Sequence, residues 1–317
     1  MTQRVYLGVD GGGTKTRFAL MDDDGQLIAH AQTGTTYHPE VGLDGVQRIL
    51  ADGIASVLAD AGVRDTHALA YAFFGLPAHG EDTQATACLD AIPAQVLGHG
   101  RYRCDNDMVC GWAGSLACGD GINIVAGTGS IGYGQRQGVE ARGGGWGEAF
   151  SDEGSAYWIA VQGLNAYSRM SDGRLPKGPL HALINDRLAL ATDLDLCARI
   201  YGPGVGTRGE IAQISRIVAE AARQGDAAAG KIYTNAGHEL AGIVVAIHDR
   251  LAFDHDENVV VSYSGGAFSA GDLLMHPFAE ALHEASPRFE LRTPLHEPHY
   301  GAALYARLLA RRHAIAA

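Results

Sequence analysis

The sequence has little positive charge. Its 24 lysines and arginines are outnumbered by 36 aspartates and glutamates, which gives a formal net charge of −12. Because nucleic acids and anionic bilayers bind clustered lysines and arginines, this balance argues against a general nucleic-acid or membrane-surface binder. Any phosphate that the protein binds must therefore be held locally.

Long hydrophobic runs are also missing. Glycines and charged residues interrupt the apolar stretches well before the roughly 20 residues that span a bilayer, so no transmembrane helix is expected. The N-terminus passes directly into the strand-like VYLGVD, without a basic segment or a long apolar segment before it. We therefore expect a cytoplasmic protein.

Paired disulfide and metal-ligand patterns are absent as well. The five cysteines are odd in number and show no CxxC spacing, which is typical of a reducing compartment. No HExxH motif occurs, and His296-Glu297-Pro298-His299 carries a proline where a metal-binding helix would need continuity. These absences disfavour a disulfide framework and a helical zinc site.

Glycine, by contrast, is abundant. The 43 glycines are about twice the usual ~7% share, and they cluster in short segments. The length of 317 residues exceeds the roughly 250–300 at which a single hydrophobic core stops growing. The sequence therefore predicts two domains and directs attention to the glycine clusters.

One pattern occurs twice along the chain. Residues 4–9, 16–21 and 26–33 are predicted strands of an antiparallel meander, with a glycine-rich turn after the first strand. Apolar residues 122–126 and 131–134 repeat the arrangement about 115 residues later, around a second glycine turn. The repeat indicates a duplicated domain.

Helices are predicted between and after these strands. Residues 43–61 show the i, i+3, i+4 apolar spacing of an amphipathic helix. Further helices are expected at 153–170, 209–224, 227–251, 270–285 and 300–311. Buried strands are expected at 68–76, 258–263 and 289–292. This alternation indicates an α/β architecture with mixed sheets, and we place the domains at 1–117 and 118–298, with a C-terminal helix, 299–317, completing the first.

The first glycine turn has the composition of a phosphate site. Turn residues without side chains bring backbone N–H groups close to an anion. The predicted phosphate ligands are Gly11, Gly12, Gly13, Thr14 and Lys15. Asp10, at the end of the preceding strand, is suited to hold Mg²⁺ through water molecules. A plain hairpin turn is the alternative, but two residues such as Asn-Gly would serve a hairpin, so phosphate binding is favoured.

Two known phosphate motifs do not fit these turns. The stretch GGGTKT lacks the GxxxxGK[ST] spacing of a Walker loop and precedes a strand. Residues 127–132 match GxGxxG, but a strand follows instead of a helix, which disfavours a dinucleotide site. A third turn, Gly265-Gly266-Ala267, lies between a predicted strand and a helix, where simple packing is an equal alternative. Three such turns would suit a nucleotide gripped from both sides of a cleft.

The motifs together resemble one known family. The segments GVDGGGTKT, VAGTGSIGYG, GGGWGEAFSDEGSAYWIA and VVVSYSGGAF follow the order of the N-acetylglucosamine kinase branch of the BadF/BadG/BcrA/BcrD ATPase family. That family belongs to the sugar kinase, actin and Hsp70 ATPase superfamily. The resemblance implies an α/β fold of two actin-like (ribonuclease H-like) domains with mixed sheets and an interdomain cleft that closes on ATP and a sugar.

The resemblance also implies roles for individual residues. Asp10 to Lys15 and Gly127-Thr128-Gly129 would hold the ATP phosphates and magnesium, and Gly265-Gly266-Ala267 would lie against the adenosine. Asp107 matches the family's catalytic acid at the start of a helix. The implied sugar contacts are Asp107, Gly129, Ser130, Gly145, Trp146, Gly147 and Asp152. Thr36-Tyr37-His38 occupy the region where a polar residue of the family touches the sugar, and a contact from Tyr37 or His38 stays open.

The acidic candidates also have structural interpretations. Asp105, Asn106 and Asp107 are all good helix N-caps, and without the resemblance that role would be favoured for Asp107. Asp152 lies before a predicted helix, where negative charge is favourable in any protein. Its place after a glycine-rich run favours binding of sugar hydroxyls. Trp146 offers either a flat apolar surface for a sugar face or an ordinary core residue.

The leading prediction is an ATP-dependent hexosamine kinase that uses Mg²⁺. It would phosphorylate the 6-hydroxyl of a small amino sugar, N-acetylglucosamine first and glucosamine second. The rival is a nucleotide-driven switch, such as a reductase activase or a sugar-sensing regulator. Activases hold an iron–sulfur cluster between two subunits, but residues 119–196 contain no cysteine, so Cys104, Cys110 and Cys118 are expected to be buried apolar residues. A homodimer is the general expectation for the oligomeric state.

Overall fold

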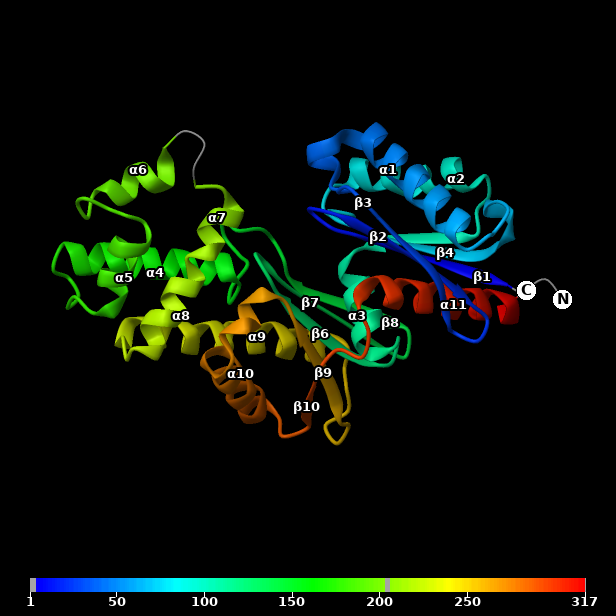
Figure 1. Cartoon of the computed structure of the whole chain (residues 1–317). Coiled ribbons are helices and arrows are strands. Elements are labelled where there is room, and N and C mark those ends of the chain that lie inside the picture. Colours follow the sequence, from blue (N-terminus) through cyan, green and yellow to red (C-terminus); the bar gives the residue numbers. More distant parts are fainter. Residues whose placement is uncertain (1–3, 203–205, 317) are drawn as a thin grey trace. The chain divides into compact units, whose positions relative to one another are not determined.

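The computed structural model describes residues 4–202 and 206–316. The chain divides into two compact units, one formed by Met1–Gly119 with Pro294–Ala317 and the other by Asp120–Thr293. Each unit contains one five-stranded mixed sheet flanked by helices (Figure 1). Within the described part of the chain, no helix is long and apolar enough to cross a membrane.

The sheet of the first unit is an antiparallel meander extended by two parallel strands. Its strands are β1 (Val5–Gly11), β2 (Thr16–Asp22), β3 (Leu27–Thr33), β4 (Leu69–Leu76) and β5 (Tyr102–Asn106). The order is β3-β2-β1-β4-β5, and β1, β4 and β5 run parallel. Their carboxyl ends therefore meet at one edge, where Asp10, Gly75 and Asp105 are in register.

Helices cover both faces of this sheet. They are α1 (His38–Asp60), α2 (Thr83–Leu97), α3 (Met108–Leu116) and α11 (Pro298–Ala316), with a 3₁₀ turn η1 (Thr66–Ala68). Because side chains alternate along a strand, Phe18 and Leu20 join the core under α1 and α2, whereas Ala19 and Met21 pack with Ala303 of α11. Figure 1 shows α1 and α2 on one face and α11, in red, on the other.

The second unit repeats this topology. Its strands are β6 (Gly121–Ala126), β7 (Ser130–Arg136), β8 (Val139–Gly144), β9 (Val259–Ser264) and β10 (Phe289–Arg292). The strands β6, β7 and β8 form the meander, and β9 and β10 add in parallel beside β6, in the order β8-β7-β6-β9-β10. The predicted duplication and the α/β class with mixed sheets are confirmed.

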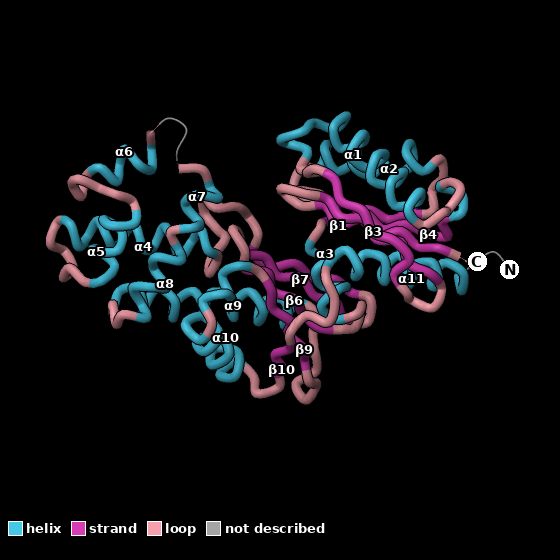
Figure 2. Tube along the Cα trace, viewed as in Figure 1, coloured by secondary structure: helices cyan, strands magenta, loops and turns pink. Residues whose placement is uncertain are grey.

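A large helical region accompanies the second sheet. Its helices are α4 (Ala156–Ser171), α5 (Pro179–Arg187), α6 (Asp195–Tyr201), α7 (Arg208–Gln213), α8 (Ser215–Arg223), α9 (Ala227–Arg250) and α10 (Asp272–Ala285), with a 3₁₀ turn η2 (Gly266–Ala270). Figure 2 shows α4, α5, α6, α7 and α8 gathered beyond the strands. Buried residues of α4, α5, α8, α9 and α10 join Ile122 and Ile124 of β6 in one hydrophobic cluster.

The prediction of one helix was wrong, and β5, α2, α5 and α6 were not predicted from the sequence. The helix predicted at 209–224 is two helices, α7 and α8, that meet at Ile214. The glycine-rich run at 143–147 contributes Gly143 and Gly144 to β8. A Cβ on Gly143 would lie 3.1 Å from Ile247 of α9, so the glycine lets the helix approach the sheet closely.

Candidate active site

The first glycine turn presents backbone donors. Gly11 pairs with Thr16 across β1 and β2, so residues 12–15 form the turn. Among the described residues, the amides of 12–15 have no hydrogen-bond partner. Thr35 Oγ1, in the segment after β3, donates to the carbonyl of Gly12 (2.8 Å), and the fully buried Thr36 lies against Gly11. The turn is therefore held in place with its N–H groups unused.

Two carboxylates meet beside this turn. Asp10 is in register with Gly75 of β4, and a Cβ on Gly75 would lie 3.2 Å from the Cα of Asp107. Burial, and then the negative charge of Asp107, raise the pKa of Asp10 to about 7, while Arg17 and Lys15 act in the opposite direction. A hard divalent cation would relieve this repulsion, so the pair suits a magnesium ion.

Three consecutive polar residues before α3, Asp105, Asn106 and Asp107, make different contacts. Asp105 forms an ion pair with Arg103 (2.6 Å) and accepts a bond from the amide of Asn106 (2.8 Å). Asn106 Oδ1 accepts from the amide of Met108 at the helix start (3.2 Å). Asp107 occupies the N-cap position, yet within the described residues its side chain makes no capping bond. The capping interpretation of Asp107 is therefore wrong, because Asn106 takes that role.

The second glycine turn, Gly127-Thr128-Gly129, also points its donors outward. The carbonyls of Gly127 and Thr128 accept bonds from the first two amides of α4 (2.9 and 3.2 Å). In the described part of the chain, the amides of Thr128 and Gly129 have no partner. Because the carbonyls of this turn are hydrogen-bonded to the start of α4, its N–H groups remain available to bind an anion.

The third turn packs directly on the second. Gly265 has φ +106°, and a Cβ there would lie 2.8 Å from the amide nitrogen of Gly127 and closer still to the carbonyl of Ala126. Only glycine combines this conformation with this approach. Gly265 therefore has a packing role, while Gly266 and Ala267 begin η2 and reach the neighbouring cavity.

A cavity of about 510 Å³ joins the second and third turns. Gly127, Thr128, Gly266 and Ala267 line it on the strand side. Helices α7, α8 and α9 complete it with Gln213, Ser215, Arg216, Ala219, Arg223 and Tyr233. Such a mixed apolar and polar hollow beside unused amides suits a nucleoside with its phosphates on the turn.

The sequence did not single out this helical wall. Arg216 and Arg223 lie in a pattern typical of an amphipathic helix, in which a polar residue facing a cavity has the same spacing as a solvated one. In the structure, Arg223 donates to the carbonyl of Ala270 (3.0 Å) and so ties α8 to the third turn.

The predicted sugar ligands Ser130 and Asp152 lie together. The amide of Ser130 donates to Asp152 Oδ1 (3.4 Å), and the Ser130 hydroxyl donates to the carbonyl of Glu153 (2.7 Å). Asp152 is only 2% exposed and has φ +59°. Its other oxygen, Oδ2, is 2.5 Å from Arg208 Nη2. Ser155 caps α4, and Asp152 lies three residues before this cap.

The remaining sugar candidates lie on the surface or in turns. Trp146 is 74% exposed, which excludes the core alternative. Gly145 and Gly147 both have positive φ, and the carbonyl of Gly147 accepts a bond from Ser151 (2.9 Å). Their contact with a sugar stays a prediction. In the first unit, Tyr37 is the exposed N-cap residue of α1, and His38 is half-buried.

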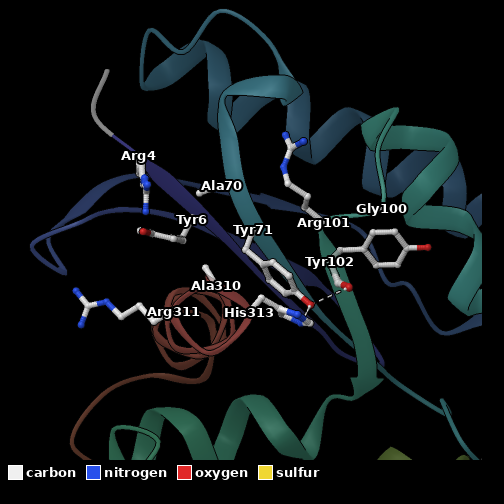
Figure 3. Close-up of a pocket in the computed structure, with 10 residues that line it drawn as sticks. All are labelled: Arg4, Tyr6, Ala70, Tyr71, Gly100, Arg101, Tyr102, Ala310, Arg311 and His313. Atoms are coloured by element: carbon white, nitrogen blue, oxygen red, sulfur yellow. Dashed lines mark hydrogen bonds between the residues drawn. The ribbon is translucent and has the colours of Figure 1, made fainter. Parts of the chain in front are cut away.

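A larger cavity, of about 940 Å³, lies elsewhere in the first unit. Arg4, Tyr6, Arg101, Arg311 and His313 are among its lining residues, and Figure 3 shows Tyr71 beside His313. The Arg101 side chain donates to the backbone carbonyls of His67 and Leu69. These donors are therefore used to stabilise the backbone and not to bind a ligand in the cavity. None of the predicted site residues lines this cavity.

The cysteines show the character of packed thiols. Cys110 is fully buried, and burial raises its pKa well above the ordinary range. Burial likewise raises the pKa of Cys104, and that of Cys118 to about 12. Thiols with raised pKa values are poor sources of the thiolates that a cluster needs.

Two curated proteins are similar in sequence to nearly the whole of this chain. The chain is 29% identical over 318 residues to an N-acetyl-D-glucosamine kinase of Dictyostelium discoideum, covering 96% of this chain and 98% of that one. It is also 29% identical over 307 residues to an N-acetylmuramic acid/N-acetylglucosamine kinase of Clostridium acetobutylicum, with the same coverage.

A solved structure shares the fold. It comes from Chromobacterium violaceum, is provisionally named an N-acetylglucosamine kinase, and superposes with a TM-score of 0.74 at 24% identity, covering 97% of this chain and 100% of that one. Together with the duplicated sheet topology, this confirms the predicted actin-like fold. The sequence profile of the BadF/BadG/BcrA/BcrD ATPase family matches residues 7–306. The chain therefore belongs to the BadF/BadG/BcrA/BcrD ATPase family.

Proposed function

We propose that this protein is an ATP-dependent kinase that phosphorylates the 6-hydroxyl of an amino sugar, N-acetylglucosamine above others. One observation carries the proposal: the nucleoside-sized cavity is lined by Gly127 and Thr128, and the buried Asp152 lies beside Gly129 of the same turn. A nucleotide site and a carboxylate suited to sugar hydroxyls are thus neighbours within one unit. The curated relatives, named as kinases of this sugar class, support the substrate.

The residues divide the chemistry of phosphoryl transfer between them. Asp107 accepts the proton of the 6-hydroxyl while the sugar oxygen attacks the γ-phosphorus and the bond to the leaving ADP oxygen breaks. Residues 12–15 and Gly127-Thr128-Gly129 offer amides to the phosphates, and Asp152 orients the sugar through its hydroxyls. Asp10 would hold Mg²⁺, with Asp107 nearby, and the ion would neutralise phosphate charge.

A coupled assay of ADP release tests the proposal. ATP and Mg²⁺ would be incubated with glucose, glucosamine, N-acetylglucosamine and N-acetylmuramic acid in turn, and the phosphorylated carbon would be identified by NMR. We expect N-acetylglucosamine to give the highest kcat/KM and a 6-phosphate product. ATP turnover that is the same with and without every sugar would instead support a nucleotide-driven switch.

A further inference from the structure

Arg208 connects the sugar carboxylate with the second glycine turn. It is the first residue of α7, whose start is fixed by a reciprocal pair of bonds between Thr207 and Glu210. Its guanidinium lies 2.5 Å from Asp152 Oδ2 and 3.2 Å from Glu148 Oε2. A Cβ on Gly129 would lie 2.5 Å from Arg208 Nη2, so the guanidinium rests directly on the glycine that ends the turn.

The buried carboxylate of Asp152 needs a compensating partner. The side chain of Asp152 is only 3% exposed, and a buried carboxylate must be compensated by hydrogen bonds or by a cation. Arg208 provides that compensation, while its own side chain remains 44% exposed. Sugar hydroxyls that donate to Asp152 would take over part of this role. The guanidinium of Arg208 would then lose part of its ion pair with Asp152. The nearest candidate anion site is the second glycine turn, which the guanidinium already contacts.

We propose that Arg208 is a further catalytic residue, whose guanidinium turns from Asp152 to the γ-phosphate of ATP when a sugar binds Asp152. The inference rests on the proposed function. A guanidinium presents several donors in a planar fork and binds carboxylates and phosphates alike, so a small rotation suffices for the exchange. It remains protonated throughout and only stabilises charge on the transferred phosphoryl group, while the proton of the sugar goes to Asp107.

The exchange would couple the two substrates. Without a sugar, Asp152 and Glu148 hold the arginine and the γ-phosphate lacks its charge partner, which slows the loss of ATP to water. With a sugar in place, the arginine is released toward the phosphate. A purely structural bridge from α7 to residues 148–152 is the alternative, and it predicts a different pattern of kinetic constants.

Two substitutions and one control separate these alternatives. In Arg208→Ala we expect kcat to fall about 10²–10³-fold, the range seen when one donor to a transition-state charge is removed. The KM for the sugar should stay unchanged or decrease, because the arginine no longer competes for Asp152. Millimolar guanidinium chloride should restore part of kcat, and Arg208→Lys should be intermediate. Arg187→Ala, which removes an exposed ion pair with Glu220, is the control.

Nucleotide binding supplies a readout that does not require turnover. With N-acetylglucosamine present, Arg208→Ala should lower the affinity for a non-hydrolysable ATP analogue by about tenfold or more, while the affinity for ADP stays the same. Failure of the wild-type protein to phosphorylate any sugar would overturn the proposed function. An unchanged ratio of analogue to ADP affinity, a near-normal kcat, or a raised sugar KM without rescue by guanidinium would each overturn the role of Arg208.

Discussion

Asp105 and Asp107 stand two residues apart, yet they have different surroundings. Asp105 forms an ion pair with Arg103, whereas Asp107 lies near Asp10 beside the first glycine turn. The sequence alone could not distinguish them, because both are good caps and both precede a helix. Their difference comes from the neighbouring strand β4, whose Gly75 leaves room for Asp107.

This contrast gives a prediction for the base. Asp107→Asn should lower kcat by at least about a hundredfold with an intact fold, because the amide cannot accept the hydroxyl proton. Asp105→Asn is the matched control and should keep kcat within a few fold. Steady-state kinetics with N-acetylglucosamine, together with circular dichroism of both variants, make the comparison. Near-normal turnover of Asp107→Asn would remove that residue from the role.

Asp10 predicts a pH dependence for the metal-free protein. Its pKa is raised in the folded state from the ordinary 3.8 to about 7, so the folded protein binds a proton more tightly than the unfolded chain. Stability should therefore fall as pH rises between about 4 and 7, by up to about 4 kcal/mol. In EDTA at pH 8, Asp10→Asn should melt at a higher temperature than the wild type, and at pH 4 the two should coincide.

An exposed carboxyl serves as the control for this experiment. Asp60→Asn, at the end of α1, should leave the melting temperature unchanged at both pH values. If Asp10→Asn were no more stable than the wild type at pH 8, the raised pKa of Asp10, caused by burial and then by the charge of Asp107, would be refuted. Added Mg²⁺ should stabilise the wild type more than Asp10→Asn.

At the scale of elements, the glycine turns differ in what they require of their glycines. Gly265 combines φ +106° with a close approach to the backbone of Ala126, so Gly265→Ala should destabilise the protein by at least about 2 kcal/mol. Gly266→Ala is the neighbouring control, because no described atom lies within 4 Å of its new Cβ. Urea denaturation of both variants measures the difference. Equal free energies of unfolding would show that the third turn tolerates a side chain.

Elements with a local signal were predictable, and those set by distant contacts were not. The meanders follow from alternating strands and glycine turns, both of which are written in short segments of sequence. The strand character of Gly143 depends on Ile243 and Ile247, about a hundred residues away, which pack against it. The cavity wall on α8 and the contact of Arg208 with Asp152 likewise need the tertiary fold, since no local spacing joins residues 152 and 208.

At the scale of the whole molecule, one architecture appears twice with different additions. The second unit carries the large helical region that lines the cavity, whereas the first unit is completed by α11. The sequence predicted the duplication from the recurring strand and turn pattern. The closing contact of α11 on β1 is close: a Cβ on Gly8 would lie 2.7 Å from the Cα of Ala303.

A substitution at Gly8 therefore tests how much the contact between β1 and α11 stabilises the first unit. Gly8→Ala should destabilise it by about 3 kcal/mol, at the upper end of the cost of overpacking, because the collision is with helix backbone. Gly100→Ala, whose Cβ would meet no described atom within 4 Å, should have little effect. Limited proteolysis should cleave Gly8→Ala faster within residues 4–119 than within 120–293. Equal cleavage of the two segments would contradict the prediction.

The contact between Gly8 and Ala303 also has a consequence for biosynthesis. The ribosome makes β1 about 290 residues before it makes the helix that covers this strand, and domains usually fold as they emerge. The segment 120–293 is continuous and has all its strands before α11 is translated. The unit that begins first is thus the one that finishes last, and until then one apolar face of its nascent sheet lacks the helix that covers it.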